Sequence, residues 1–283
     1  MIEHAQPTAS AVTAGMISST VRELGLQEQA VCIHASLRSF GAVTGGASAI
    51  VDAFLAEGCT VMVPTFSTAA YEVWPTPHDL IRQNAWGADA PSGPTPGIDR
   101  VYCIDATEID PDMGAMAATV LPSVGHVRGA HPLNSFTAVG PRAHDLIDRQ
   151  TLTDVFAPLH ALIEAHGFVL LMGVGLDRLT LLHAAEERAG RRPFIRWAMN
   201  PNGCIVRVRA GGCSEGFDRL APVLAKLTVA KTVGGSRWLV LPAGPALTAA
   251  ANAIQRDPGI THCEDPTCAR CNDALLGGPV LED

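Results

Sequence analysis

Hydrophobic residues recur along the chain in short blocks with two alternating spacings. Apolar positions at helical spacing predict a helix over 10–24, and compact apolar runs predict buried strands at 30–34 and 59–63. A helix at 47–56, opened by two glycines, connects these strands. The order of strand, glycine-rich turn, helix and strand is typical of a parallel β-α-β unit.

The same alternation resumes later in the chain. The further predicted elements are strands at 136–139, 168–173, 204–209 and 237–241, and helices from 112, at 154–166, at 179–188 and at 243–255. The run FVLLMG at 168–173 is the candidate for a central strand. No linker rich in proline, glycine, serine or repeated charge divides the 283 residues, so the pattern predicts an α/β fold in a single domain covering 1–283.

Residues 65–110 interrupt this regularity. They have few apolar runs and contain five prolines: Pro75, Pro77, Pro91, Pro94 and Pro96. The stretch is too long for an ordinary connection, and long loops of this kind often act as lids over a site. We interpret it as a lid-like insertion, and a surface excursion without a role is the alternative.

The net charge and the absence of targeting signals limit the partners and the location that the sequence allows. A net charge of -8 and a pI of about 5.6 argue against nucleic acid, and the densest arginine group, at 188–196, is typical of a solvated helix end. The sequence shows neither a signal peptide nor an apolar stretch of membrane-spanning length, so we expect a cytoplasmic protein that binds no membrane. An acidic surface attracts small cations, although salt screens this attraction.

Catalytic chemistry is indicated by one histidine of the ten. His183 follows a strand and a glycine turn, and the i, i+3 spacing places Glu186 on the same helix face. A base at the mouth of a strand, oriented by a carboxylate, is what proton abstraction requires; a helix-end histidine beside a surface glutamate is the alternative. The glycine turns at 36–46 and 173–180 open helix N-termini that suit phosphates, or use glycine for steric reasons alone.

The tail at 261–273 holds a cluster of cysteines. Cys263, Cys268 and Cys271 form a C-x4-C-x2-C pattern that suits a structural zinc ion. A fourth ligand is needed, and the candidates are His262, Cys204 and Cys213. Free thiols or a disulfide are the alternatives.

Five segments in order resemble the aminoglycoside 3-N-acetyltransferase family. They are HASLRSFGAVTGGASAIVDAF (34–54), TVMVPTFS (60–67), DMGAM (112–116), HPLNSFTAVGPRA (131–143) and LMGVGLDRLTLLHAAEERA (171–189), with a weaker match at 211–218. The resemblance implies a mixed, largely parallel sheet flanked by helices, distinct from the smaller GNAT fold. It also implies acetyl-CoA as the donor and the 3-amino group of an aminoglycoside as the acceptor, an activity that confers antibiotic resistance.

The resemblance also assigns roles to residues. It implies that His183 is the base that activates the amine, supported by an acid some thirty positions downstream, either Glu215 or Asp218; Glu186 is a third candidate. The implied coenzyme A site comprises Ser36, Leu37, Ser39, Gly45, Gly46 and Thr180, and His131 would line the same cleft.

The lid region departs from the family pattern. Its acids could receive a cationic amine or could be solvated loop carboxylates: Glu72, Asp79, Asp89, Asp99, Asp105, Glu108 and Asp110. The expected partner is a small cationic amine. Acetylation of another amine metabolite, and an inactive CoA-binding protein, remain alternatives, and the oligomeric state is open, with a homodimer as one option.

Overall fold

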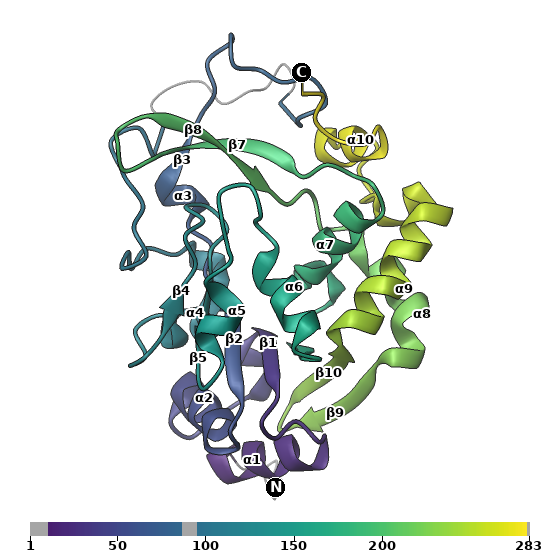
Figure 1. Ribbon diagram of the computed structural model, residues 1–283. Helices are drawn as coiled ribbons and strands as arrows, with labels where there is room; N and C mark the ends of the chain where they lie inside the picture. The colour runs from purple at the N-terminus through teal and green to yellow at the C-terminus, as the bar shows by residue number, and fades with distance from the viewer. Residues whose placement is uncertain (1–10, 87–94, 282–283) are drawn as a thin grey trace, which may run out of the picture.

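The centre of the protein is a seven-stranded sheet with the order β4-β5-β2-β1-β6-β10-β9 (Figure 1). The computed structural model describes residues 11–86 and 95–281. The strands span Ala30–Ala35 (β1), Thr60–Pro64 (β2), Val127–Arg128 (β4), Phe136–Val139 (β5), Phe168–Met172 (β6), Val229–Val233 (β9) and Ser236–Pro242 (β10). Strand β1 pairs in parallel with β2 and β6, and the remaining pairings are antiparallel.

The direction of the strands confirms the expected mixed, largely parallel sheet. Through the antiparallel steps, β4 and β9 run the same way as β1, β2 and β6, whereas only β5 and β10 of this sheet run oppositely. Because the carboxyl ends of β1, β2 and β6 meet at one edge, the segments that follow these strands are brought together there.

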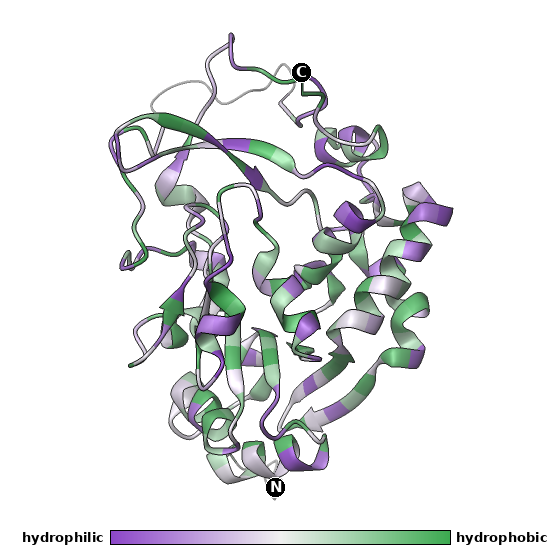
Figure 2. Ribbon diagram, viewed as in Figure 1, coloured by the Kyte–Doolittle hydropathy of each residue, from purple (hydrophilic) through white to green (hydrophobic). Residues whose placement is uncertain are grey.

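Helices cover both faces of the sheet, and alternate residues of β1 face each layer. Val31 and Ile33 pack with α1 (Ala14–Glu23), α2 (Gly46–Ala56) and α4 (Gly114–Val120). The other layer is formed by α5 (Ala143–Ile147), α6 (Ala157–Glu164), α7 (Leu181–Arg188), α8 (Ala221–Leu224) and α9 (Ala243–Arg256). Figure 2 shows the hydrophobic colour running through the central sheet, as burial on both faces requires.

A smaller three-stranded sheet crosses above this core (Figure 1). It joins β3 (Glu72–Val73), β7 (Phe194–Met199) and β8 (Ile205–Ala210). Strand β3 and the short helix α3 (Thr68–Tyr71) belong to the proline-rich stretch, which therefore lies against β7 and makes a further bridge from Val101 to Met199. Helix α10 (Ala269–Leu275) lies beside this sheet near the C-terminus.

Six short 3-10 helices connect these elements in the described part of the chain. They span Leu37–Phe40 (η1), Pro111–Met113 (η2), Leu176–Arg178 (η3), Phe217–Leu220 (η4), Ala225–Leu227 (η5) and Pro258–Thr261 (η6). Four of them, η1, η2, η3 and η6, flank the functional residues described below. No helix within 11–86 and 95–281 has the length and apolar character needed to cross a membrane.

Candidate active site

A cavity of about 1040 Å³ opens at the carboxyl ends of β1, β2 and β6. Its walls include residues 33–38 at the end of β1 and just beyond it, residues 111–117 around η2 and α4, and residues 177–180 before α7. The side chains of His183, Arg196 and Arg270 complete parts of the wall. The strand order thus assembles one large site from segments far apart in the sequence.

His183 and Glu186 form a buried pair on the wall of this cavity. His183 Nδ1 lies 2.9 Å from Glu186 Oε2, and each side chain is 12% exposed. Because a carboxylate only accepts, Nδ1 carries the proton in this contact and Nε2 presents its lone pair. No residue of 11–86 or 95–281 hydrogen-bonds to Nε2, which leaves it available to accept a proton.

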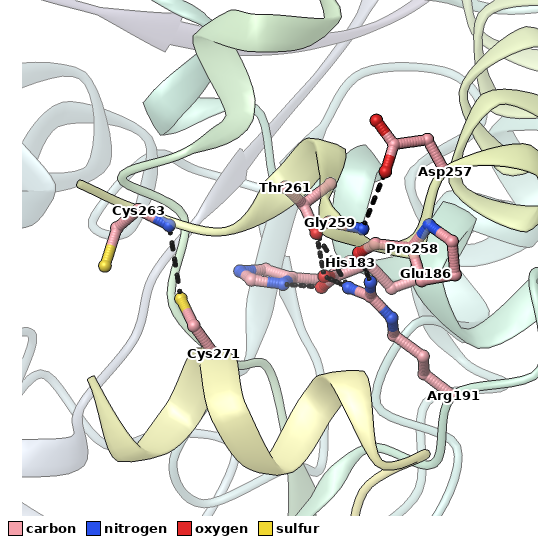
Figure 3. A network of polar contacts seen from close by, with 9 residues as sticks. All are labelled: His183, Glu186, Arg191, Asp257, Pro258, Gly259, Thr261, Cys263 and Cys271. Carbon is pink, nitrogen blue, oxygen red and sulfur yellow. Dashed lines mark hydrogen bonds and ion pairs between the residues drawn. The ribbon is translucent and has the colours of Figure 1, made fainter. Parts of the chain in front are cut away.

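The carboxylate of Glu186 is held at its other oxygen as well (Figure 3). Arg191 Nη1 and Thr261 Oγ1 both donate to Oε1, the hydroxyl at 3.1 Å. Arg191 also donates to Thr261 Oγ1 and to the Pro258 carbonyl, so η6 anchors the guanidinium. A carboxylate fixed at both oxygens holds the imidazole in one tautomer and one orientation.

Three neighbours confine the imidazole ring. Phe217 meets it edge-on with centroids 4.8 Å apart, and Phe156 lies nearly parallel to it at 6.4 Å. Gly211, just after β8, closes the remaining side, because a Cβ there would lie 2.8 Å from His183 Cδ2. The ring therefore has little freedom to leave the geometry that Glu186 selects.

The other two acids proposed to support His183 lie elsewhere. Asp218 Oδ1 accepts a hydrogen bond from the Leu176 amide at 2.8 Å and so secures η3. Glu215 is exposed. Of the three candidates, Glu186 is the one in contact with the histidine.

The expected coenzyme-binding residues separate into two groups. Ser36, Leu37 and Thr180 line the cavity. Ser39 instead bonds the Ser36 carbonyl at 2.7 Å and Ser236 Oγ at 2.8 Å, which braces the turn beneath the cavity wall.

The prediction that Gly45 and Gly46 contact the coenzyme is not matched by their position. Both lie outside the cavity, because α2 begins only at Gly46, after η1 and a further turn. Their φ angles of 83° and 62° are left-handed, which favours glycine for steric reasons. Their position agrees with the steric alternative for this turn.

His131 also lies elsewhere than predicted. It is fully buried and lies outside the cavity wall. Its Nε2 hydrogen donates to the Arg209 carbonyl at 2.8 Å, and Nδ1 accepts from the amides of Leu133 and Asn134 at 3.2 and 2.9 Å. Both ring nitrogens are occupied, so His131 shapes the loop that brings Leu133 and Asn134 to the cavity.

Glu72 is the acid of the proline-rich stretch that reaches the cavity wall. Burial raises its pKa, while Arg196, whose Nε lies 3.4 Å from Oε1, and Arg270 lower it. Burial in turn lowers the pKa of Arg196 to about 10. Glu72, Arg196 and Arg270 thus place one carboxylate and two cations on the cavity wall.

The remaining acids of that stretch serve local contacts or lie away from the cavity. Asp110 accepts from the amides of Thr68 and Ala69 at the start of α3, and Glu108 accepts from the Tyr71 hydroxyl at 2.8 Å. Asp79 accepts from Thr76. Asp99 and Asp105 are exposed, and Asp89 lies outside the described residues.

Sequence reasoning missed several polar residues of the cavity wall. They are Arg38, Asp112, Asn134, Asp177, Arg178, Arg196 and Arg270. Asn134 is notable because its side-chain oxygen is buried without a partner in 11–86 and 95–281. The strand pattern did mark the loops that carry several of them, since they follow β1 and β6, but nothing local to Arg196 or Arg270 indicates the cavity.

Four cysteine sulfurs gather beside the catalytic pair. Cys213, Cys263, Cys268 and Cys271 bring their Sγ atoms within 4.8 Å of one another, so they could hold a metal ion. Of the three candidates for a fourth ligand, Cys213 is the one in the cluster. The ring of His262 instead contacts the Cys263 carbonyl and Asn272 Oδ1, and Cys204 is exposed elsewhere.

Comparison with known proteins identifies the family. The model of the family described as aminoglycoside 3-N-acetyltransferase matches residues 32–255, so the chain belongs to this family. Aminoglycoside N(3)-acetyltransferase VIII of Streptomyces fradiae is 35% identical over 188 residues, which cover 63% of this chain and 62% of that relative. The match thus spans about three-fifths of the relative's length.

Solved structures share the fold at lower identity. A gentamicin complex of a variant of aminoglycoside acetyltransferase AAC(3)-IVa has a TM-score of 0.75 at 23% identity, covering 96% of this chain and all of that one. A binary complex of AAC-IIIb with CoASH has a TM-score of 0.68 at 21% identity, covering 87% and 97%. The expected antibiotic N-acetyltransferase-like α/β fold is confirmed.

Proposed function

We propose that this protein transfers the acetyl group of acetyl-CoA to an amine, with His183 as the general base. The observation that carries the proposal is the 2.9 Å contact between His183 Nδ1 and Glu186 Oε2 on the wall of a cavity of about 1040 Å³. Membership of the acetyltransferase family supports it. A protein that only binds CoA has no need of an oriented base.

The chemistry is an acyl transfer that needs a proton acceptor. The amine nitrogen attacks the thioester carbonyl carbon, and His183 Nε2 takes the proton that the nitrogen must lose. The carbon–sulfur bond then breaks, and the proton returns from the imidazole to the leaving thiolate. The products are the amide and CoA thiol. Glu186 stabilises the imidazolium that exists between these two proton transfers.

The donor binds, in this proposal, along the wall made by Ser36, Leu37 and Thr180. Arg38 and Arg178 line the same cavity, and guanidinium groups suit the phosphates of coenzyme A. The solved complex of AAC-IIIb with CoASH supports a CoA site in this fold. No geometry for the coenzyme is implied beyond these wall residues.

The acceptor is, in this proposal, the 3-amino group of an aminoglycoside. Glu72, Asp112 and Asp177 give the cavity carboxylates for a polycation, and the net charge of -8 favours its approach. The names of the relatives support this class of substrate, and the antibiotic resistance that follows from it. We also propose that 1–283 form one domain with 65–110 as its lid-like insertion.

A thiol-release assay with acetyl-CoA tests the activity. We expect release with aminoglycosides that carry a free 3-amino group and none with analogues acetylated there. His183→Ala should lower turnover by roughly 10²–10⁴-fold, the usual contribution of a general base, with CoA affinity nearly unchanged.

The acceptor panel separates the alternatives. Simple amines and other amine metabolites are assayed beside the aminoglycosides, and CoA binding is measured by calorimetry. Release with a metabolite amine alone would replace the proposed acceptor. CoA binding without release for any amine, or unchanged turnover in His183→Ala between pH 6 and 9, would contradict the proposed catalysis.

The four-cysteine cluster is proposed to hold a structural zinc ion. Zinc with four thiolates is tetrahedral with Zn–S bonds of about 2.3 Å, which places the sulfurs roughly 3.8 Å apart. Sulfurs within 4.8 Å of one another need only small shifts to reach this arrangement.

A further inference from the structure

Two segments that hold the catalytic pair both end in the four-cysteine cluster. Gly211, which closes one side of the His183 ring, lies two residues before Cys213. Thr261, which donates to Glu186, lies two residues before Cys263. The segment that packs on the histidine ring and the segment that holds its carboxylate therefore reach the same four sulfurs. Figure 3 shows Cys263 and Cys271 beside the His183–Glu186 pair.

The segments around Cys213 and Cys263 also contact each other directly, close to the four sulfurs. The backbone of Gly216 packs against the Thr261 and His262 carbonyls, where a Cβ would lie 2.4 Å from the former. The Cys263 amide donates to Cys271 Sγ at 3.4 Å. A void of only about 10 Å³ separates Glu186, Arg191 and Cys213, so the cluster and the pair are packed directly against each other.

We propose that a zinc ion bound by Cys213, Cys263, Cys268 and Cys271 positions the His183–Glu186 pair. The inference rests on the proposed function and adds a role to the metal. Four thiolates select a soft or borderline divalent ion, and zinc prefers the closed tetrahedral set that leaves no open position for substrate. The ion links the segment after β8, where Gly211 packs on the His183 ring, to the segment at the end of η6, where Thr261 bonds to Glu186. It therefore fixes the position of the ring and of the carboxylate together.

The expected effect of losing the metal follows from this geometry. Without an ion, the four sulfurs no longer join 211–213 to 261–263, and only the packing of Gly216 and the hydrogen bonds of Thr261 still hold these segments in place. The histidine is then less firmly oriented, while Ser36 and Leu37, which follow β1 and are not part of the cluster, keep their place in the cavity wall. Turnover should fall with CoA affinity retained, and His183 should become more accessible.

The experiment compares the full-length chain with two matched variants. Cys213→Ser removes the ligand that joins the wall to the tail, and Cys204→Ser removes an exposed thiol outside the cluster. For each protein, purified without added zinc, we measure bound zinc, CoA affinity, turnover, and the rate at which diethyl pyrocarbonate modifies His183 by peptide mass analysis. Cobalt substitution reports tetrahedral thiolate ligation by its visible spectrum.

The expected results are as follows. Wild type and Cys204→Ser hold about one zinc per chain, as a structural site retains its metal, and Cys213→Ser holds less. Cys213→Ser also loses turnover by roughly tenfold or more, the usual cost of losing a positioning partner, with unchanged CoA affinity and faster His183 modification. If Cys213→Ser fails to fold, a mercurial that displaces zinc from folded wild type gives the same comparison, and excess thiol then removes the mercurial from the cysteines before zinc is added back.

Two outcomes would overturn the inference. If wild type contains no metal and its four cluster thiols titrate freely, the zinc site does not exist. If loss of the metal changes neither turnover nor the rate of His183 modification, the metal does not position the His183–Glu186 pair. If wild type itself releases no thiol, the proposed function fails, and the zinc content and the His183 modification rate still decide the inference.

Discussion

At the scale of single residues, the proposed base His183 is paired with a carboxylate that has both oxygens occupied. Glu186 orients His183 through Oε2 and is itself held by Arg191 and Thr261 through Oε1. A carboxylate placed in this way fixes which imidazole nitrogen carries the proton. In the proposed mechanism, Glu186 therefore positions the base and stabilises its charged form.

Glu186→Gln is expected to lower turnover by roughly 10²-fold. The amide retains the shape of the side chain, but it no longer offers a negative charge to the imidazolium, and its NH₂ group can face Nδ1 and favour the wrong tautomer. Turnover and CoA affinity are measured together, and only turnover should change. Glu215→Gln is the matched control, because that exposed acid contacts neither His183 nor the cavity. A larger loss in Glu215→Gln than in Glu186→Gln would reverse the assignment.

At the scale of elements, the chain at the end of β8 packs against the imidazole ring of His183. Strand β8 ends at Ala210, and Gly211 follows it directly against the imidazole. The absence of a side chain at this position lets the backbone approach the ring closely. In the proposed mechanism, the small sheet thus confines the base through its backbone.

Gly211→Ala is expected to reduce turnover while the protein remains folded. The added Cβ would lie 2.8 Å from His183 Cδ2, so the ring must tilt away from its contact with Glu186. Misplacement of a catalytic group by about 1 Å can cost roughly 10²-fold in rate. Gly15→Ala in α1 is the control, since its Cβ would meet nothing closer than 3.9 Å. If Gly211→Ala keeps full activity and an unchanged melting temperature, the close contact of Gly211 with the His183 ring is not needed for turnover.

The elements that the sequence predicted share one property, which is that their signal is local. Strands β1, β2, β5 and β6 are compact buried runs, and they lie within a residue or two of the predicted ranges. Strand β7 was missed because Arg196 interrupts its apolar residues, and this arginine is buried against partners that are distant in sequence, among them Glu72 and the Asn84 carbonyl. Strand β9 was missed because it lies at the sheet edge with exposed residues.

In the candidate site too, contacts between residues close in sequence could be predicted, and contacts between distant segments could not. His183 and Glu186 are three positions apart on one helix, so their pairing could be predicted from spacing. Thr261 contributes to that pair from 75 positions away, and Cys213 joins three cysteines that lie 50 to 58 positions later. Such contacts depend on the arrangement of whole elements. His131 was expected to line the cleft, and its motif does not reveal that both ring nitrogens bond to backbone.

At the scale of the whole molecule, two buried histidines link stability to pH. Burial lowers the pKa of His34 and of His131 to about 4, whereas an unfolded histidine titrates near 6.5. The unfolded chain therefore binds more protons between these values. The stability that the neutral rings contribute is fully present above pH 6.5 and is lost as the pH falls toward 4.

The free energy of unfolding should thus fall on acidification from pH 6.5 to 4.5. Each histidine contributes up to about 1.4 kcal/mol per pH unit. His131→Gln removes one of the two groups and should flatten the slope measured by urea unfolding, while its lost backbone contacts lower stability at pH 7.5 by roughly 1–3 kcal/mol. His144→Gln, at a side chain 77% exposed, should leave the slope unchanged. An unaltered slope in His131→Gln would contradict the linkage.

The order of strands in the central sheet also governs how the chain reaches its native state. Strand β1 finds one neighbour, β2, about 30 positions later, but its other neighbour is β6, with Val31 opposite Phe168. Closing so long a loop is entropically costly and slow, and sheets with such distant parallel pairings fold slowly. Until β6 arrives, one edge of an almost entirely apolar strand stays open to other chains. During folding, the pairing of β1 with β6 therefore competes with self-association of unfolded chains. Dilution slows self-association and so favours the pairing within the chain.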